Sequence, residues 1–409
     1  MKYGLYLLSL MLGGCLASCG SASEQAIEDT WTPIAEWKVI KGDSVMVADV
    51  NKAEVETTLP LELIAEDYQV IKLGKEAEEY SELSDAFITD NYIGVSGYGK
   101  TPFRLFRKDG TFVTQVGSVG EEENGKYRVV SNAQVDEANN RIYIMPENFK
   151  ETPTFSRKEP TLLVYDLKGN YLHEIPLACW IGFGSNFKVD TEKGEIIVIG
   201  KEVSPESKRY RTWVQDMKGN LIYGIYDEDK KNDDYFGYGT VSLFHTDAID
   251  TYAIVSRSAY SVRKETEFLY HLNQKERRLV PKFQAKTKEI SNFIYELPWY
   301  YIVESTVHAL SADTQTPMTI VNKKTLKGAH FNGFVTPEGL LLNQYDLLAK
   351  TRNGYFSLVG KESRILERIQ KMDKTKLTKE QRKKMEQLYQ QLNSDKKDDT
   401  ILFMAKFKN

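Results

Sequence analysis

One hairpin pattern recurs at a nearly constant spacing and restricts the possible folds more than any other feature of the chain. Each copy is an alternating strand, a turn and a second alternating strand, as in FRLFRKDGTFVTQVG, LLVYDLKGNYLHEI and TWVQDMKGNLIYGI. Glycine supplies the positive φ that such turns require. Weaker copies follow in FLYHLNQKERRLVPKF and TIVNKKTLKGAHF. The turns lie near residues 109, 168, 218, 274 and 324, and a period of roughly 50 to 60 residues is on the scale of propeller repeats.

A second type of hairpin recurs between these copies. We identify it in six places: DAFITDNYIGVSG, NAQVDEANNRIYIMP, FKVDTEKGEIIVIG, FHTDAIDTYAIVS, IYELPWYYIVES and GFVTPEGLLLNQY. Short apolar runs bounded by turn residues are typical of strands. Two hairpins per unit and six units predict an all-β fold, a six-bladed β-propeller. A pair of β-sandwiches fits a single sustained period less well, and a parallel β-helix would need a much shorter repeat.

The ends of the repeat region predict how the ring closes. DYQVIKL at residues 67–73 precedes the first unit, and TILFMAKFK at residues 400–408 ends the chain. Pairing of these N- and C-terminal strands would remove an open edge. Between residues 361 and 395 the pattern changes to two amphipathic helices. We therefore predict a propeller over residues 61–409 with a helical hairpin inserted in its last blade at 361–395, either packed on the propeller or docking a partner.

The N-terminus has the features of a bacterial lipoprotein signal. A Lys and an apolar run of about ten residues, too short to span a bilayer, precede LGGCLASCGSAS. We predict that residues 1–19 are the signal and end at an acylated Cys19, and that residues 20–60 are a tether and lead-in. Cys15 is the other candidate, and an ordinary signal peptide or an apolar N-terminal strand are the alternatives. The predicted location is the outer membrane, facing the periplasm or the cell surface, with the lipid anchor as the only membrane contact.

The composition restricts the class of partner. The formal net charge is −4 over 409 residues, which argues against a nucleic-acid binder. Tyr occurs 24 times and Phe 18 times, whereas His occurs only 5 times. This composition suits a β-rich extracellular protein with binding surfaces better than an enzyme that depends on histidine.

One stretch, IGVSGYGKTP at residues 93–102, matches a phosphate-binding loop. That motif needs a helix directly after the Thr, so that the helix N-terminus holds the phosphates. Here Pro102 follows at once, and Phe103 begins a strand. We therefore predict a connection between two hairpins of the first blade and no nucleotide.

The chain resembles the TolB-like six-bladed propeller lipoproteins of the Bacteroidetes, a family largely without assigned function. The resemblance rests on LASC, YQVIKL, LFRKDGTFVTQVGSVG, VYDLKGNYLHEIPL and the closing ILFMAKFK. It covers most of residues 60–409 and implies the fold. Relatives often carry a Gly-Pro-Gly-Glu-Tyr loop after the first blade, where this chain has GSVGEEENGKYR without Pro. The propeller fold hosts lyases, hydrolases and binding modules alike, so the resemblance does not imply an activity.

The long connections between hairpins and between blades are expected on one face of the propeller, where binding sites usually lie. They are rich in aromatic residues and Arg, which suit stacking on sugars or peptides and pairing with carboxylates. The alternative is that half or more of the rings only pack the loops. The loop residues are Tyr98, Tyr127, Arg128, Phe155, Arg157, Trp180, Phe183, Arg209, Tyr210, Tyr235, Phe236, Tyr238, Arg257, Tyr260 and Arg263. Among them we predict Tyr98, Arg128, Trp180, Tyr210, Arg257 and Tyr260 as binding residues.

Motifs for catalysis or metal binding are scarce. H-E-x-x-H, C-x-x-C and G-x-S-x-G do not occur, and DEDKKNDD lacks the ligand spacing of a calcium loop. His245 and His308 could bind a metal near the central channel, but a metal site usually has three or more ligands. We therefore predict no cofactor and a non-catalytic lipoprotein that binds a glycan, peptide or envelope protein on its long-loop face. The alternatives are a lyase or hydrolase at the channel mouth, or a scaffold of an envelope complex.

Overall fold

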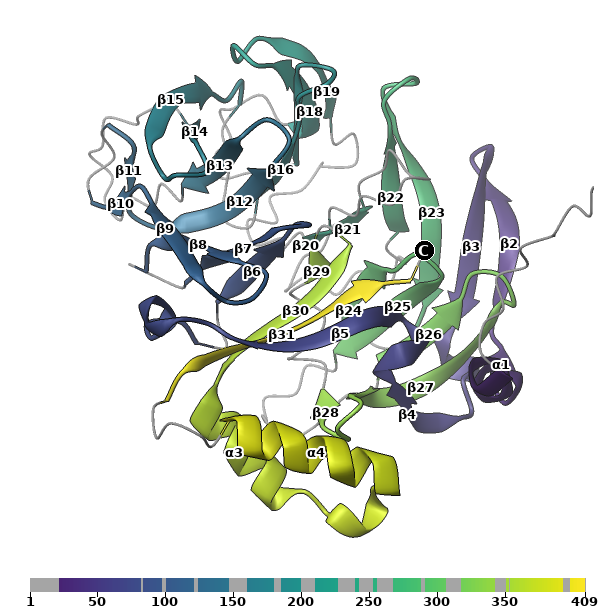
Figure 1. The fold of residues 1–409 in the computed structure, drawn as a ribbon. Helices are drawn as coiled ribbons and strands as arrows, with labels where there is room; N and C mark the ends of the chain where they lie inside the picture. The colour runs from purple at the N-terminus through teal and green to yellow at the C-terminus, as the bar shows by residue number, and fades with distance from the viewer. Residues whose placement is uncertain are drawn as a thin grey trace, which may run out of the picture.

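The computed structural model describes residues 22–81, 84–97, 101–120, 124–146, 160–179, 185–199, 210–226, 240–242, 253–255, 268–287, 291–306, 318–342, 351–352, 354–392 and 398–408. In these residues the fold is an all-β propeller. Antiparallel sheets stand around a common centre, and neighbouring sheets pack face to face (Figure 1).

Four sheets have four strands each, and their strands follow one another from the centre outward. They are β6 (Asp85–Ile88), β7 (Tyr92–Ser96), β8 (Phe103–Arg107) and β9 (Phe112–Val116); β12 (Val130–Asp136), β13 (Arg141–Pro146), β14 (Thr161–Tyr165) and β15 (Tyr171–Pro176); β16 (Asn186–Asp190), β17 (Glu195–Ile199), β18 (Tyr210–Asp216) and β19 (Leu221–Tyr226); and β29 (Thr351–Arg352), β30 (Tyr355–Lys361), β31 (Thr400–Phe407) and β5 (Ala65–Lys72).

Two further sheets are larger. One contains β20 (Thr240–Ser242), β21 (Ala253–Val255), β22 (Phe268–Asn273) and β23 (Arg278–Lys286), followed by β3 (Asp43–Asp49) and β2 (Ala35–Ile40). The other contains β24 (Ser291–Glu296), β25 (Tyr300–Thr306), β26 (Met318–Asn322) and β27 (Lys327–Val335), with β1 (Thr32–Pro33), β4 (Glu56–Pro60) and β28 (Leu341–Leu342) on β27. The remaining elements are β10 (Ser118–Val119), β11 (Lys126–Tyr127), α1 (Ala22–Asp29), α3 (Glu362–Lys371), α4 (Lys379–Leu392) and the 3-10 turns Val50–Lys52, Leu61–Leu63, Lys75–Ala77 and Lys374–Lys376.

The recurring Asp-x-Lys-Gly-Asn sequence forms a turn that is closed by its own Asp. Asp166 Oδ1 accepts hydrogen bonds from the main-chain N–H of Lys168 and of Asn170, both at 2.9 Å. Its Oδ2 accepts from the Asn170 side chain at 2.9 Å. Asp216 makes the same three bonds to Lys218 and Asn220. The predicted hairpins β14–β15 and β18–β19 are confirmed at these turns.

Glycine in these turns also allows neighbouring blades to touch. Gly110, Gly169 and Gly219 have φ values of 86°, 84° and 88°. A Cβ on Gly169 would lie 2.4 Å from the carbonyl oxygen of Gln115 in β9, which belongs to the preceding sheet. A Cβ on Gly110 would lie 2.2 Å from the carbonyl oxygen of Lys72. Each turn therefore packs against the outermost strand of the sheet before it.

Residues 22–60, expected as a tether and lead-in, contribute secondary structure to the sheets. β1 and β4 both pair with β27, and β3 pairs with β23. Buried Trp31 packs edge-on against Tyr300, and the Glu28 carboxylate accepts hydrogen bonds from the Tyr300 hydroxyl and the Asn322 amide. The N-terminal segment therefore covers the outer edges of two neighbouring sheets (Figure 1).

One hairpin assignment from the sequence is wrong. GFVTPEGLLLNQY was expected to begin the sixth unit, but its first half is the end of β27, and Leu341–Leu342 pairs back onto β27 as β28. Gly333, at φ 152°, lies within the register shift between Phe331 and Phe334. A Cβ there would lie 2.2 Å from the Leu342 carbonyl oxygen. The alternation of apolar residues is the same in both arrangements, so the pattern could not separate them.

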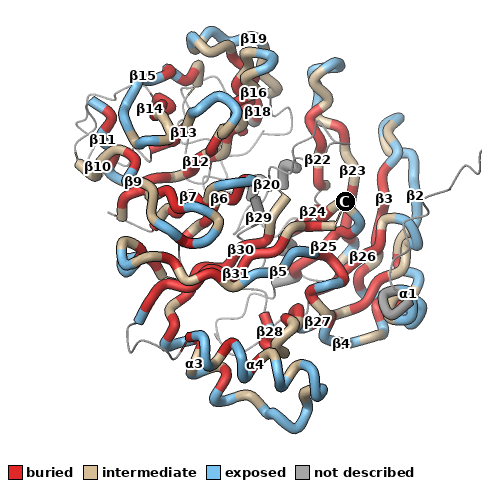
Figure 2. Tube along the Cα trace, in the orientation of Figure 1, coloured by how far each residue is buried: buried red, intermediate tan, exposed pale blue. Residues whose placement is uncertain are grey.

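The hydrophobic core is divided into clusters that lie between successive sheets (Figure 2). β5 pairs antiparallel with β31, and Leu402 and Met404 of β31 share a cluster with Ile88 of β6. α3 and α4 lie between β30 and β31 in sequence and bury Ile369 and Met385 against the neighbouring cluster. No helix among the described residues is long and apolar enough to cross a membrane.

Candidate ligand-binding face

The propeller has two unlike faces. One end of the sheets carries tight turns, such as residues 89–91, 137–140, 166–170 and 217–220; we call it the short-turn face. The other end, the long-connection face, carries the links between second and third strands and between sheets. Because strands within a sheet alternate in direction, these two kinds of connection emerge at opposite ends.

Most residues predicted to bind a ligand lie outside the described part of the chain. These are Tyr98, Trp180, Arg257 and Tyr260, and the same holds for Cys19 and for the alternative metal ligands His245 and His308. Arg128 and Tyr210 are described, and they belong to neighbouring blades. The predicted set is therefore not assembled by the described residues.

Arg128 follows a loop that is fixed from below by a buried tyrosine. β10 and β11 pair in parallel, with Val119 opposite Tyr127. The Tyr127 hydroxyl donates to the Val116 carbonyl oxygen at 2.6 Å and accepts from the Phe103 N–H at 2.8 Å. Burial raises the pKa of Tyr127 to about 12, so the hydroxyl keeps its proton. The next residue, Arg128, is exposed.

Other tyrosines near these connections also have structural roles. The Tyr80 hydroxyl donates to the Pro102 carbonyl oxygen, and that of Tyr165 to the Gly125 carbonyl oxygen, both at 2.6 Å. Tyr210, predicted as a binding residue, is half-buried at the start of β18. A Cβ on Gly224 would lie 2.3 Å from the Tyr210 ring, so this ring packs across β19. Several loop rings therefore pack the propeller, as the alternative interpretation expected.

The segment that resembles a phosphate loop connects two strands, as predicted. β7 ends at Ser96 and β8 begins at Phe103. Gly94, the first glycine of the pattern, pairs within β7, and a Cβ on it would lie 2.4 Å from the Phe103 ring. This glycine is therefore required for packing. Residues 98–100 lie outside the described chain.

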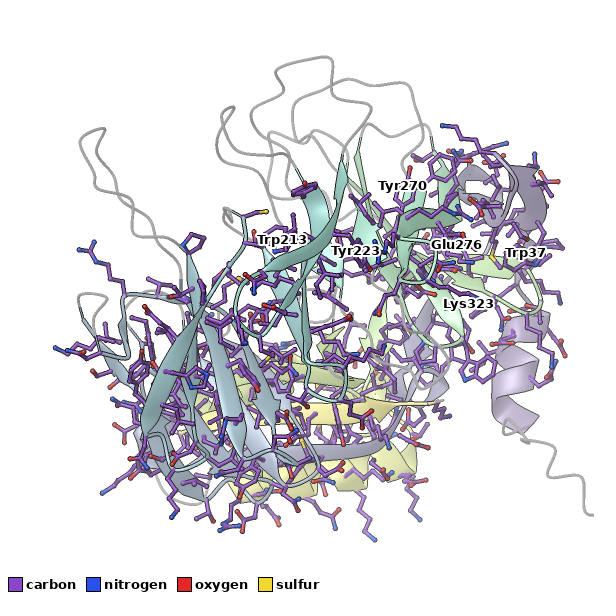
Figure 3. The ribbon with its side chains drawn as sticks, turned by 90° about the horizontal axis from the view of Figure 1, so that it is seen from above. Trp37, Trp213, Tyr223, Tyr270, Glu276 and Lys323 are labelled. Atoms are coloured by element: carbon purple, nitrogen blue, oxygen red, sulfur yellow. The ribbon has the colours of Figure 1, made fainter. Side chains whose placement is uncertain are left out.

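The strongest charge cluster lies between two sheets at the short-turn face. Glu296 at the end of β24 is 2.5 Å from His271 Nε2 in β22 and accepts a hydrogen bond from Lys323 Nζ at 2.6 Å. The side chains of Glu296, His271 and Lys323 are 8%, 8% and 18% exposed. Lys323 Nζ also lies 4.6 Å from the centre of the Tyr301 ring. Figure 3 places Lys323 close to Glu276 and away from Trp213.

This cluster is built to stabilise the fold. Burial raises the pKa of Glu296, but His271 and Lys323 outweigh that effect and lower it to about 2. The carboxylate is therefore ionised at neutral pH, and both of its oxygens are occupied. Sequence reasoning missed these residues because they are far apart in the chain. The available signal was His271, which follows Leu269 on a core-facing position of an alternating strand.

Two inner strands are joined by side-chain amides. The Gln134 amide of β12 donates to the Val189 carbonyl oxygen of β16 at 3.0 Å and accepts from the Val189 N–H at 2.8 Å. Asn132 and Asn186 are also hydrogen-bonded. Over the residues that the structure describes, no group of three or more His, Cys, Asp or Glu side chains is arranged to hold a metal ion.

Solved structures share the architecture at low sequence identity. A Bacteroides fragilis protein presumed to be exported is 14% identical, with a TM-score of 0.56 over 87% of this chain and 99% of that one. A Bacteroides vulgatus member of the duf4221 family is 11% identical, with a TM-score of 0.39 over 84% and 97%. A Bacteroides caccae protein of unknown function is 10% identical, with a TM-score of 0.37 over 73% and 94%. At these identities the likeness to the first structure shows the fold alone.

No curated protein matches the chain in sequence. The resemblance to TolB-like lipoproteins therefore stays a prediction, whereas the propeller fold and the likeness to Bacteroides proteins are confirmed. Residues 44–297 match the family DUF5128, described as a 6-bladed beta-propeller. This match covers more than half of the chain, and the protein therefore belongs to the DUF5128 β-propeller family.

Proposed function

We propose that this protein is an envelope-anchored lipoprotein whose propeller binds a glycan, peptide or protein partner on the long-connection face, without catalysis. The anchored loop that ends at Arg128 is the observation that carries the proposal. A backbone fixed by Tyr127 reduces the entropy lost on binding. A guanidinium pairs with carboxylates through two parallel hydrogen bonds. We therefore favour a partner that carries carboxylates, such as an acidic glycan or peptide.

The short-turn face supports this assignment by contrast. Asp166 and Asp216 are occupied by their own turns, and Glu296 is occupied by His271 and Lys323. Polar groups that are satisfied internally gain little from a ligand.

The anchor and the ring are part of the same proposal. Acylation of Cys19 would hold the protein at the outer membrane, because several acyl chains give stable attachment. Pairing of β5 with β31 would close the six-bladed ring, with α3 and α4 as an insertion in its last blade. The antiparallel β5–β31 register and the core shared by β31 and β6 support this closure.

The binding claim is tested by probing arrays of acidic glycans and peptides with the purified protein and its Arg128→Ala variant. We expect the substitution to weaken binding by roughly 1 to 3 kcal/mol and to leave the melting temperature unchanged. Arg107→Ala, an exposed arginine at the end of β8 on the short-turn face, is the matched control and should bind as the wild type does. Equal binding by the Arg128 variant, or turnover of any bound compound, would contradict the proposal.

Anchoring is tested separately by fatty-acid labelling in cells. Labelling should be lost in Cys19→Ala and retained in Cys15→Ala. The reverse result would move the anchor to Cys15.

A further inference from the structure

The β2–β3 hairpin ends its sheet in an exposed edge. β2 is the last strand in the order β2–β3–β23–β22–β21–β20, and among the described strands none lies beyond it. Figure 1 shows β2 at the periphery of the molecule, and Figure 3 places Trp37 on the same outer side. Trp37 is 52% exposed and Val39 is 78% exposed. An edge strand with exposed apolar side chains is a template for another strand.

The hairpin geometry determines which main-chain groups face this edge. Lys41 and Gly42 form a two-residue turn with φ values of 53° and 89°. In such a turn the flanking residues, Ile40 and Asp43, form a hydrogen-bonded pair. Alternate residues then point the other way, so the N–H and C=O of Trp37 face outward.

We propose that the partner for this edge is a second copy of the chain, paired β2 to β2 in antiparallel orientation with Trp37 opposite the partner's Trp37. A two-fold axis through this pair gives the closed symmetry that most soluble oligomers adopt. The register sets Glu36 against the partner's Lys38 and Lys38 against the partner's Glu36. The strand is therefore complementary in charge to a copy of itself.

The apolar side chains match in the same register. Ala35 lies opposite the partner's Val39, and Trp37 meets its own copy. Within one chain these residues are on the sheet face of Met46 and Ala48, through the pairs Trp37–Met46 and Ala35–Ala48. Met46 and Ala48 belong to the core between the β20–β23 and β24–β27 sheets. Pairing would extend this apolar row across the interface, and cross-strand pairs of this kind stabilise sheets.

Other registers satisfy neither condition. A register centred on Val39 would set Trp37 against the partner's Lys41, and Lys38 against the partner's Ile40. A register centred on Ala35 would use its N–H, which already donates to the Leu326 carbonyl oxygen at 3.0 Å. One centred on Lys38 would set two ammonium groups against each other, on a residue whose main-chain groups face β3. Charge and main-chain geometry therefore select the same register.

Cross-linking tests the register directly. Glu36→Cys and Lys38→Cys full-length chains are purified separately, mixed and oxidised mildly. Opposing residues of a non-hydrogen-bonded pair have Cα atoms about 4.5 Å apart, within the range of a disulfide. We expect a 36–38 cross-link in the mixture, identified by mass spectrometry, and much less in either chain alone. Ser44→Cys in β3, mixed with Glu36→Cys, is the control and should not cross-link.

Charge reversal tests the affinity. In sedimentation of the full chain in detergent, Glu36→Lys should raise the dimer dissociation constant about tenfold, because it places like charges opposite each other in both pairs. Adding Lys38→Glu should restore it. Melting temperatures should stay unchanged, since both side chains are exposed, 64% and 41%. A monomer at every concentration, a dimer that ignores the charge swap, or an equal cross-link with the control would overturn the proposal.

Discussion

The blades complete their outer edges in two different ways. In the sheets that end in β9, β15 and β19, which we call the open-edge blades, the fourth strand is the last. In the sheets built on β23 and β27, the covered blades, the N-terminal segment continues the sheet. The burial of the fourth strand follows this division. Five of the six β15 residues are exposed, whereas β27 has a single exposed residue in nine.

The contacts between blades differ in the same way. In the open-edge blades a turn glycine touches the preceding sheet, as Gly169 does at the Gln115 carbonyl oxygen. In the covered blades the turns contain Arg277 and Leu326 at positive φ, 52° and 61°. There the N-terminal segment supplies the contact instead, because Leu326 accepts main-chain hydrogen bonds from Ile34 and Ala35. One repeat can therefore be secured either from within or from a distant part of the chain.

The largest expected effect comes from removing the anchor of the N-terminal cover. Trp31→Ala should lower the free energy of unfolding by about 3 to 5 kcal/mol, because a buried indole is lost against Tyr300. Denaturant unfolding measures this. Trp31→Phe should cost much less, since the indole N–H is buried without a hydrogen-bond partner. Equal costs for the two variants would mean that the ring contact is not what secures the cover.

Next in size is the glycine contact of the open-edge blades. Gly169→Ala should destabilise by about 2 to 4 kcal/mol, because the new Cβ adds a clash to an unfavourable positive φ. Gly194 has φ 66°, and no atom lies within 4 Å of the place that a Cβ would take. Gly194→Ala should therefore show the conformational cost alone, about 1 to 2 kcal/mol. If thermal unfolding gives the same loss for both, the blade-to-blade contact has no energetic weight.

The charge cluster between the covered blades predicts a pH dependence. The pKa of Glu296 falls from 4.5 to about 2 on folding, so its ionised form stabilises the native state. That contribution, about 2 to 3 kcal/mol, is complete above pH 4.5 and is lost as the pH falls toward 2. Unfolding measured from pH 6 to about 2.5 should show a smaller acid loss in Glu296→Gln than in the wild type. An identical slope would show that Glu296 does not contribute to the acid loss.

The smallest effect is expected at a single turn of an open-edge blade. Asp166→Ala removes three hydrogen bonds but leaves an exposed turn, so the loss of unfolding free energy should be about 1 kcal/mol. Asp166→Asn keeps an acceptor oxygen and should lie between the Ala variant and the wild type in thermal unfolding. A loss as large as that of Gly169→Ala would show that the Asp orders more than its own turn.

The open-edge blades were largely predictable from sequence, because their turns are local. Alternating strands around Lys168-Gly169 and Lys218-Gly219 define both the hairpin and its register. The capping box predicted by Thr378 and Gln381 also forms, with reciprocal bonds of 3.0 and 3.1 Å.

The covered blades were less predictable, because their strands come from a distant segment. The β2–β3 hairpin carried the same signal, Lys41-Gly42 between alternating strands, but it lies before the repeat region. Nothing local could show that it extends the sheet of β23. The candidate site had the same limit: Arg128 was recognisable as a loop residue, whereas its support by Tyr127 depends on contacts with β8 and β9.

Hydrogen exchange of the backbone amides tests the central comparison most directly. We expect amides of β27 such as His330, whose N–H donates to the Val55 carbonyl oxygen at 2.8 Å, to exchange far more slowly than edge amides of β15 and β19. In Trp31→Ala the protection of β23 and β27 should fall while that of β15 and β19 stays unchanged. Exchange of β27 in the wild type as fast as that of β15 would contradict the account that the N-terminal segment covers these blades.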